Sequence, residues 1–242
     1  MRSNFVSRDT SDRRLAGTGW VYWRPRIEGI SELGILHGSH RDLATHFHEE
    51  VQITFVLAGR RSILMRGEVI DLTVGECACI PAGVPHRSLA GSPDLVSLNA
   101  YLPAGDYAFA SMRLDIERLW PMVQRFRWIE LSAIFLAHRK DVNRVSVDRR
   151  LPIGPDCRES VSELAAQMGR SREGFSRMFA KRYGMPPHAF RLTSRLNRAK
   201  ELLRAGEAVA AVAADTGFAD QSHLGRCFQR AFGVTPGRYR VG

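Results

Sequence analysis

Three histidines and one glutamine in the first half of the chain have the spacing of a binding site. His46, His48 and Gln52 are separated by even numbers of residues, so on an extended strand their side chains share one face. His86 lies in another short β-rich run and can meet them from a neighbouring strand of a small barrel. Imidazole and amide groups can hydrogen-bond a small ligand or one another. We therefore expect these four side chains to line one interior site.

The two segments that carry these residues resemble the two motifs of the cupin family. They are HFHEEVQITFVLAG (46–59) and GECACIPAGVPH (75–86), in which His46, His48, Gln52, Gly59, Gly75, Pro81, Gly83 and His86 match. The resemblance implies a metal site, which in cupins uses three histidines and a glutamate. Gln52 stands where the acid would be, and its neutral carbonyl would hold a divalent ion less tightly. Two interpretations stay open: a bound zinc, nickel or iron ion, or side chains that hydrogen-bond an effector or each other.

A second group of polar residues lies on helices predicted near the C-terminus, where start and stop signals repeat. The signals are Ser160 with Glu163, Gly169, Ser171, Gly184, Gly206, Gly217, Asp220 and Gly233. Each round gives a short helix, a turn and a second helix, and a long helix over about 187–203 separates the rounds. This pattern predicts two helix-turn-helix units, whose second helices can enter a DNA major groove.

Residues that read bases must lie early on each second helix, opposite its apolar stripe. The candidates are Arg172, Glu173, Ser176 and Arg177 in the first unit, and Gln221, Ser222, His223 and Arg226 in the second. Arginine suits guanine and glutamine suits adenine. The residues predicted to contact DNA phosphates are Arg182, Arg191, Arg195, Arg198 and Arg230. Gly174 and Gly225 fall inside the two second helices, where each costs about 1 kcal/mol against alanine.

The run AADTGFADQSHLGRCFQRAFGVTPGRYR resembles the signature of the AraC/XylS family of bacterial regulators. The matching residues are Ala213, Gly217, Phe218, Asp220, Ser222, Leu224, Arg226, Phe228, Phe232, Gly233, Pro236, Tyr239 and Arg240. The upstream run SVSELAAQMGRSREGFSRMFAKRYGMPPHAF, with RLNRAKELL, is similar to the family's first unit. The resemblance implies a rigid pair of readers that enter successive major-groove segments on one DNA face.

The charge balance agrees with a nucleic-acid partner. The 242 residues include 35 Lys and Arg against 25 Asp and Glu, a net charge of +10, and most of this excess lies in residues 156–242. A regulator with double-stranded DNA and a small-molecule effector as partners is therefore predicted, with RNA polymerase as a further candidate partner. The competing class is a metal-dependent cupin enzyme, a dioxygenase or an isomerase, with a basic helical tail. No nucleophile with its base and no phosphate-binding glycine loop favours an enzyme.

The predicted fold class has two domains, an all-β cupin-like barrel with trailing helices and an all-α domain of two helix-turn-helix units. The expected boundaries are a loose start over 1–18, a sensor and dimerisation domain over 19–140, a linker over 141–155 and a DNA-binding domain over 156–242. Within the sensor, short β-rich runs extend to about Leu102, and helices are expected over 107–119 and 121–139.

The segment LSAIFLA (131–137) is apolar almost all round. Either this helix is wedged between the barrel and its neighbours, or it meets a second subunit, and we favour a homodimer. The four cysteines show no disulfide framework, and Cys77 and Cys79 are expected to be small buried hydrophobes. With neither a signal peptide nor a membrane span in the sequence, a cytoplasmic protein is expected.

Overall fold

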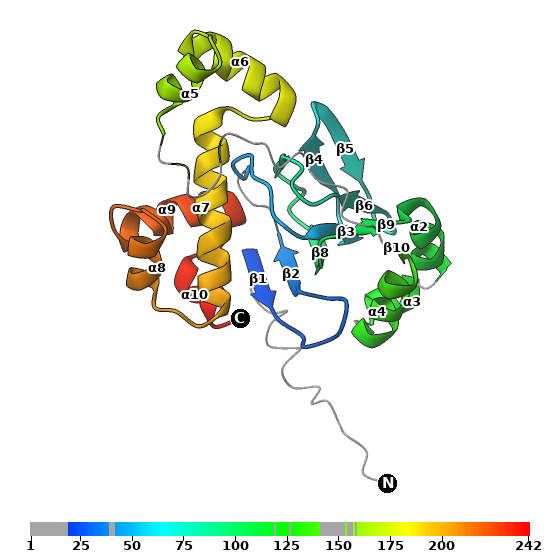
Figure 1. Ribbon diagram of the computed structural model, residues 1–242. Coiled ribbons are helices and arrows are strands. Elements are labelled where there is room, and N and C mark those ends of the chain that lie inside the picture. The colour runs from blue at the N-terminus through cyan, green and yellow to red at the C-terminus, as the bar shows by residue number, and fades with distance from the viewer. Residues whose placement is uncertain are drawn as a thin grey trace.

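The computed structural model describes residues 19–38, 42–118, 120–125, 127–140, 153, 157 and 159–242. The N-terminal half combines β-sheets with a group of helices, and the C-terminal half is helical (Figure 1). The predicted fold class is therefore confirmed. The expected loose start and nearly all of the expected linker lie outside the described residues, but Ile153 is described and is buried against the first helices of the C-terminal half.

The described strands form antiparallel sheets. The large sheet has the order β1 (Gly19–Trp23), β2 (Glu32–His37), β8 (Val96–Leu102), β3 (Val51–Ala58) and β6 (Cys77–Ile80). The small sheet has the order β5 (Glu68–Leu72), β4 (Arg61–Met65) and β7 (His86–Ser88), and the two-residue strands β9 (Asp106–Tyr107) and β10 (Arg139–Lys140) pair separately. Positive φ angles at Arg66 (φ 55°) and Gly67 (φ 85°) close the tight turn between β4 and β5.

Three helices cover one face of the large sheet: α2 (Phe109–Arg118), α3 (Trp120–Gln124) and α4 (Trp128–Ala137). Met112, Ile116 and Phe135 from these helices pack with Ile53 and Phe55 of β3. Cys77 and Cys79 border the same core as free thiols, and burial raises their pKa values to about 11 and about 12. Cys77 is buried as predicted, whereas Cys79 is only half-buried.

The single helix expected over 121–139 is wrong, because the segment forms α3 and α4 with a break between them. Arg127 precedes α4 with a ψ of 71°, which is not helical. The face of α4 that packs on the sheet carries Leu131 and Phe135, whereas Ile129 is 69% exposed and Leu136 is 36% exposed. In this chain α4 is therefore not wedged on all sides.

The C-terminal half contains six helices in the described residues. They are α5 (Val161–Gln167), α6 (Arg172–Tyr183), α7 (Pro187–Arg204), α8 (Val209–Asp215), α9 (Gln221–Phe232) and α10 (Pro236–Arg240). The predicted capping box of Ser160 and Glu163 is present, and Ser171 and Asp220 accept hydrogen bonds from the backbone at the starts of α6 and α9. Gly184 and Gly233 end these helices in the left-handed conformation.

Helix α7 joins two separate apolar cores. Near its N-terminal end, Phe190 packs with Phe175 and Phe179 of α6. Further along, Leu196 and Leu203 pack with α8 and α9. The two helix-turn-helix units are consequently fixed to different parts of one straight element (Figure 1). No helix in the described part of the chain is long and apolar enough to cross a bilayer.

The end of α9 leaves no room for a side chain at Gly233. A Cβ atom there would overlap the indole ring of Trp20 on β1, and φ is 75°. We predict that Gly233→Ala lowers the free energy of unfolding by clearly more than the 1–2 kcal/mol expected from a left-handed alanine alone. Gly169→Ala is the matched control, because Gly169 is also left-handed but faces open space. Equal losses in urea unfolding of the two variants would contradict the close contact between β1 and α9.

Candidate effector pocket and nucleic-acid interface

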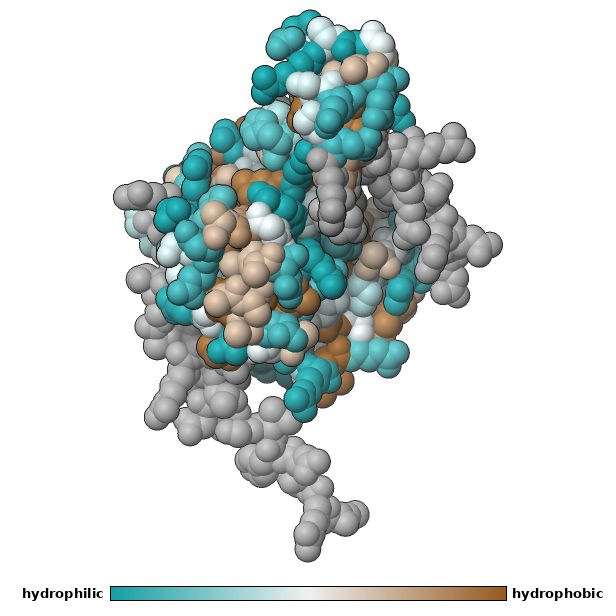
Figure 2. Space-filling view, turned by 60° about the vertical axis from the view of Figure 1, so that its left-hand side comes forward, coloured by the Kyte–Doolittle hydropathy of each residue, from teal (hydrophilic) through white to brown (hydrophobic). Residues whose placement is uncertain are grey.

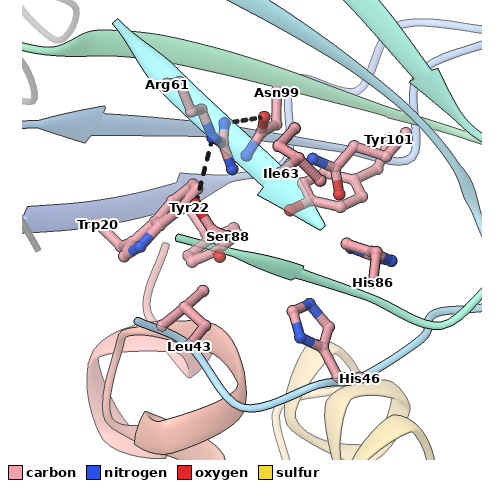
Figure 3. A pocket seen from close by; sticks show the side chains of 11 residues that line it. Trp20, Tyr22, Leu43, His46, Arg61, Ile63, His86, Ser88, Asn99 and Tyr101 are labelled. Carbon is pink, nitrogen blue, oxygen red and sulfur yellow. Dashed lines mark hydrogen bonds between the residues drawn. The ribbon is translucent and has the colours of Figure 1, made fainter. Parts of the chain in front are cut away.

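A small pocket lies between the two sheets of the barrel (Figure 3). Its lining residues are Trp20, Tyr22, Leu43, His46, Gln52, Arg61, Ile63, His86, Ser88, Asn99 and Tyr101. The space left free at its centre is about 10 Å³, which is enough for about one water molecule. In this conformation the pocket is therefore nearly closed by its own side chains.

The structure brings the three histidines together. The ring centroids of His46 and His86 are 4.6 Å apart, and those of His48 and His86 are 4.9 Å apart. The Nδ1 atom of each ring lies 2.8–2.9 Å from a backbone carbonyl oxygen. The partner is Ala44 for His46, Glu50 for His48 and Val84 for His86. Burial lowers the pKa of all three rings, to about 3 for His46, so an uncharged imidazole is favoured at neutral pH.

The arrangement does not fit a metal ion. No group of three or more His, Cys, Asp or Glu side chains in the described residues is placed to hold one. His48 directs its Nε2 at Gln52, whose Oε1 is 2.8 Å away, so this nitrogen is already engaged. Coordination of a metal ion by His48 Nε2 would require His48 and Gln52 to separate.

Gln52 instead begins a chain of polar contacts across the barrel interior. Its Nε2 donates to Thr54 Oγ1 over 2.7 Å, and the Thr54 hydroxyl donates to Asn99 Oδ1 over 2.7 Å. Arg61 Nη1 donates to the same Asn99 oxygen over 2.9 Å. The histidine cluster and Arg61 are thereby linked through neutral side chains.

Sequence reasoning missed Arg61, Asn99 and the aromatic wall of the pocket. Arg61 is only 3% exposed, donates to Ser97 Oγ over 2.7 Å and lies over the Trp20 ring at 5.2 Å. Burial lowers its pKa to about 10, so it remains cationic at neutral pH. The available signal was alternation, since pocket-lining residues two apart recur on several strands. Such pairs are Trp20 and Tyr22, Arg61 and Ile63, His86 and Ser88, and Asn99 and Tyr101.

The barrel contacts α7 through a buried ionic cluster. Glu32 of β2 has no exposed surface, and its Oε2 lies 3.4 Å from Lys200 Nζ and 3.1 Å from Arg204 Nη2. Arg204 also pairs with Glu50 and donates to the Tyr239 hydroxyl over 2.8 Å. Two carboxylates therefore face two cations, and the cluster is electrically balanced. Glu49, which precedes Glu50 in the chain, is exposed.

The segment His46–Phe47–His48 faces both halves of the protein. His46 and His48 join the histidine cluster beside the pocket, while the Phe47 ring lies 4.8 Å from that of Phe190 in α7. The Phe47 carbonyl also accepts a hydrogen bond from Asn197 Nδ2 over 3.1 Å. A shift of this segment at the pocket would consequently move Phe47 and change its packing in the core of the first helix-turn-helix unit.

The residues expected to read bases lie at the starts of α6 and α9. Their exposed members are Arg172, Glu173, Arg177, Gln221, Ser222 and Arg226, and Ser176 and His223 are half-buried. The centroid of the His223 ring lies 5.3 Å from that of Phe218, so the His223 side chain packs against the protein surface. A largely hydrophilic surface surrounds these helices, with a pale brown patch over α8, whose Ala210, Ala211 and Ala214 are exposed (Figure 2).

The arginines expected to contact phosphates fall into two groups. Arg182, Arg198 and Arg230 are exposed. Arg191 and Arg195 are half-buried and donate to the backbone carbonyls of Glu159 and Gly217, which ties α7 to the loops of both units. Arg198 pairs with Glu201 over 2.8 Å. The exposed group is better placed for an external anion.

Comparison with protein families gives two matches. A helix-turn-helix domain family matches residues 164–241, and a cupin domain family matches residues 35–96. Both matches fall on the segments assigned to these folds from sequence.

Two named relatives match over most of the chain. The HTH-type transcriptional regulator MtrA of Neisseria gonorrhoeae is 26% identical over 97% of this chain and 81% of its own. The probable transcriptional regulator LumQ of Photobacterium leiognathi is 30% identical over 81% of this chain and 91% of its own. The crystal structure of ToxT from Vibrio cholerae with a bound unsaturated fatty acid has the same fold, with a TM-score of 0.52 at 14% identity over 100% of this chain and 97% of ToxT.

The ionic cluster makes the contact between barrel and α7 sensitive to acid. The positive charges of Lys200 and Arg204 outweigh burial and lower the pKa of Glu50 from 4.5 to about 2. A lowered carboxyl pKa stabilises the folded state above pH 4.5, and this contribution is lost as the pH falls from 4.5 to 2. We predict that Glu50→Gln loses up to about 3 kcal/mol of unfolding free energy at pH 7, and that the difference from wild type shrinks below pH 4.5.

Urea unfolding of both proteins across this pH range measures the effect. Glu117→Gln is the matched control, because its ion pair with Arg113 lies on the surface and should be worth less than about 1 kcal/mol. A difference between wild type and Glu50→Gln that stays constant from pH 7 to pH 3 would refute the role assigned to Glu50.

Proposed function

This chain belongs to the AraC/XylS family of transcription regulators, and we propose that it reads DNA with α6 and α9 under the control of an effector bound in its barrel. The proposed base-reading residues are those exposed early on the two helices, with Arg177 and Arg226 as the principal candidates. The proposed phosphate contacts are Arg182, Arg198 and Arg230, with Arg191 and Arg195 positioning the units on α7.

The observation that carries this proposal is the attachment of both units to α7. This helix has 18 residues, which corresponds to a length of about 27 Å. Successive major-groove segments on one face of B-DNA are about 34 Å apart. Two reading helices attached to different parts of such a spacer are held within about one turn of DNA of each other, and both leave polar residues exposed at their N-terminal turns.

We assign residues 19–140 to the sensor, 141–155 to the linker and 156–242 to the reader. The ranges matched by the two domain families fall within this division. The pocket lined by His46, Gln52 and His86 is the proposed effector site. Because the His48 nitrogen and Gln52 engage each other, we propose that an organic effector is bound there by hydrogen bonds and that a metal ion is not required.

We further propose that the chain forms a homodimer through the outward face of α4, where Ile129 and Leu136 are exposed. RNA polymerase is retained as a proposed partner of the DNA-bound protein. The alternative of a cupin enzyme finds no support among the relatives, since MtrA and LumQ are both named as transcriptional regulators.

Selection from a randomised DNA duplex library tests the reading function, and Arg226 gives the sharpest variant. We predict that Arg226→Ala weakens binding by about 1–3 kcal/mol at one or two base positions, because a bidentate contact to a base edge is lost. Arg230→Ala is the matched control on the same helix and should weaken selected and scrambled duplexes equally. Equal loss on both duplexes for Arg226→Ala would mean that this residue contacts only phosphate.

Gly225 tests how closely the α9 backbone approaches DNA. A Cβ atom at Gly225 would meet nothing within 4 Å in the protein, and its backbone is helical. We predict that Gly225→Ala stabilises folding by about 1 kcal/mol while weakening DNA binding, because the methyl group would occupy space needed at the groove. Gly237→Ala in α10, also in open space, is the control and should leave DNA affinity unchanged. Unchanged DNA affinity of Gly225→Ala would exclude close approach at this position.

A further inference from the structure

The barrel pocket contains a buried positive charge that has no acidic partner among the described residues. The hydrogen bonds identified for the Arg61 guanidinium are donated to neutral oxygens, on Ser88, Ser97 and Asn99. The nearby carboxylates of Glu32 and Glu50 are paired with Lys200 and Arg204 instead. A buried cation without a counter-ion is costly for a folded protein. The pocket is therefore suited to a ligand that brings a negative charge.

Asn99 provides a second and independent sign of a missing ligand. Its side chain has no exposed surface, and its Nδ2 has no hydrogen-bond partner. The orientation of the amide is fixed, because Oδ1 already accepts hydrogen bonds from Thr54 and Arg61. The unpartnered amide nitrogen of Asn99 and the guanidinium of Arg61 thus belong to two contacting side chains that line the pocket (Figure 3).

The remaining walls of the pocket indicate the rest of the ligand. Trp20, Tyr22, Ile63 and Tyr101 supply aromatic and apolar surface, and His46 and His86 are uncharged at neutral pH. Burial raises the pKa of both tyrosines, so neither hydroxyl provides a negative charge. A bare inorganic anion would leave these apolar walls without a partner.

We propose that the effector is an organic acid, with its carboxylate held by Arg61 and Asn99 and its apolar body lying against Trp20, Tyr22 and Tyr101. This inference rests on the proposed function, because it names the chemical class of that effector. A carboxylate matches the planar donors of arginine, supplies the missing negative charge and can accept a hydrogen bond from the unpartnered Asn99 Nδ2.

Uptake of such an acid must move the pocket walls, since the free space holds only about one water molecule. Two of these walls touch the end of α9. Trp20 packs against Gly233, and the His46 ring lies 5.4 Å from that of Phe232. The body of the acid therefore pushes on the C-terminal end of the second reading helix.

Binding by the full-length protein of octanoate, phenylacetate and 2-naphthoate, each compared with its neutral primary amide, tests this inference. We expect at least one acid to raise the melting temperature saturably, with an affinity at least ten-fold above that of its amide. Asn99→Asp supplies the counter-ion within the chain. It should raise the melting temperature of the ligand-free protein and weaken the acid at least ten-fold. Gln124→Glu adds the same charge on the exposed surface of α3 and should change neither value.

Arg61→Met is a second variant, which removes the cation. It should abolish the preference for acid over amide. This variant keeps the test decisive if Asn99→Asp does not fold. The inference is overturned if no acid binds better than its amide, or if the folded variants bind the acid as wild type does. Selection of DNA sequences by the same wild-type preparation separates the two levels. Persistent selection with no acid binding overturns only the ligand class, whereas acid binding without selection overturns the proposed reading function.

Discussion

The contact of Glu32 with Lys200 and Arg204 is the constraint on which the arrangement of the two halves depends. Glu32 is fully buried, so it must keep its cationic partners whenever the halves are docked. Such a cluster adds little net stability compared with apolar packing, but removal of one partner leaves a buried charge and is strongly unfavourable. The cluster thereby selects one orientation of α7 on the barrel.

Helix α7 passes this orientation to both reading units. Its N-terminal part shares a core with α6 and its later part shares a core with α8 and α9. Residues at or next to the pocket also contact both units. Phe47 packs beside Phe190 of α7, and Trp20 packs beside Gly233 at the end of α9. An effector that moves the pocket walls acts on packed contacts of both units, and no long path between distant sites is required.

Much of the reader could be predicted from sequence because its signals are local. Capping residues such as Ser160, Ser171 and Asp220, and the left-handed glycines Gly184 and Gly233, act within one helical turn. The histidine cluster could be predicted from alternation along short strands. The break before α4 was not predicted, since no proline or glycine marks it.

The polar end of the pocket could not be predicted, because it depends on pairing between strands distant in sequence. Arg61 and Asn99 come from β4 and β8, which belong to different sheets, and a buried arginine on a strand looks like a surface residue in sequence alone. The ionic cluster was missed for the same reason, since Glu32 and Lys200 meet only when the two halves dock.

We infer that α7 sets the spacing of the two reading helices on one face of DNA. Hydroxyl-radical footprinting of the protein on a selected duplex measures that spacing directly. We expect two protected patches on the same face, with centres about one helical turn, or about 34 Å, apart. A single patch, or two patches on opposite faces of the duplex, would contradict it.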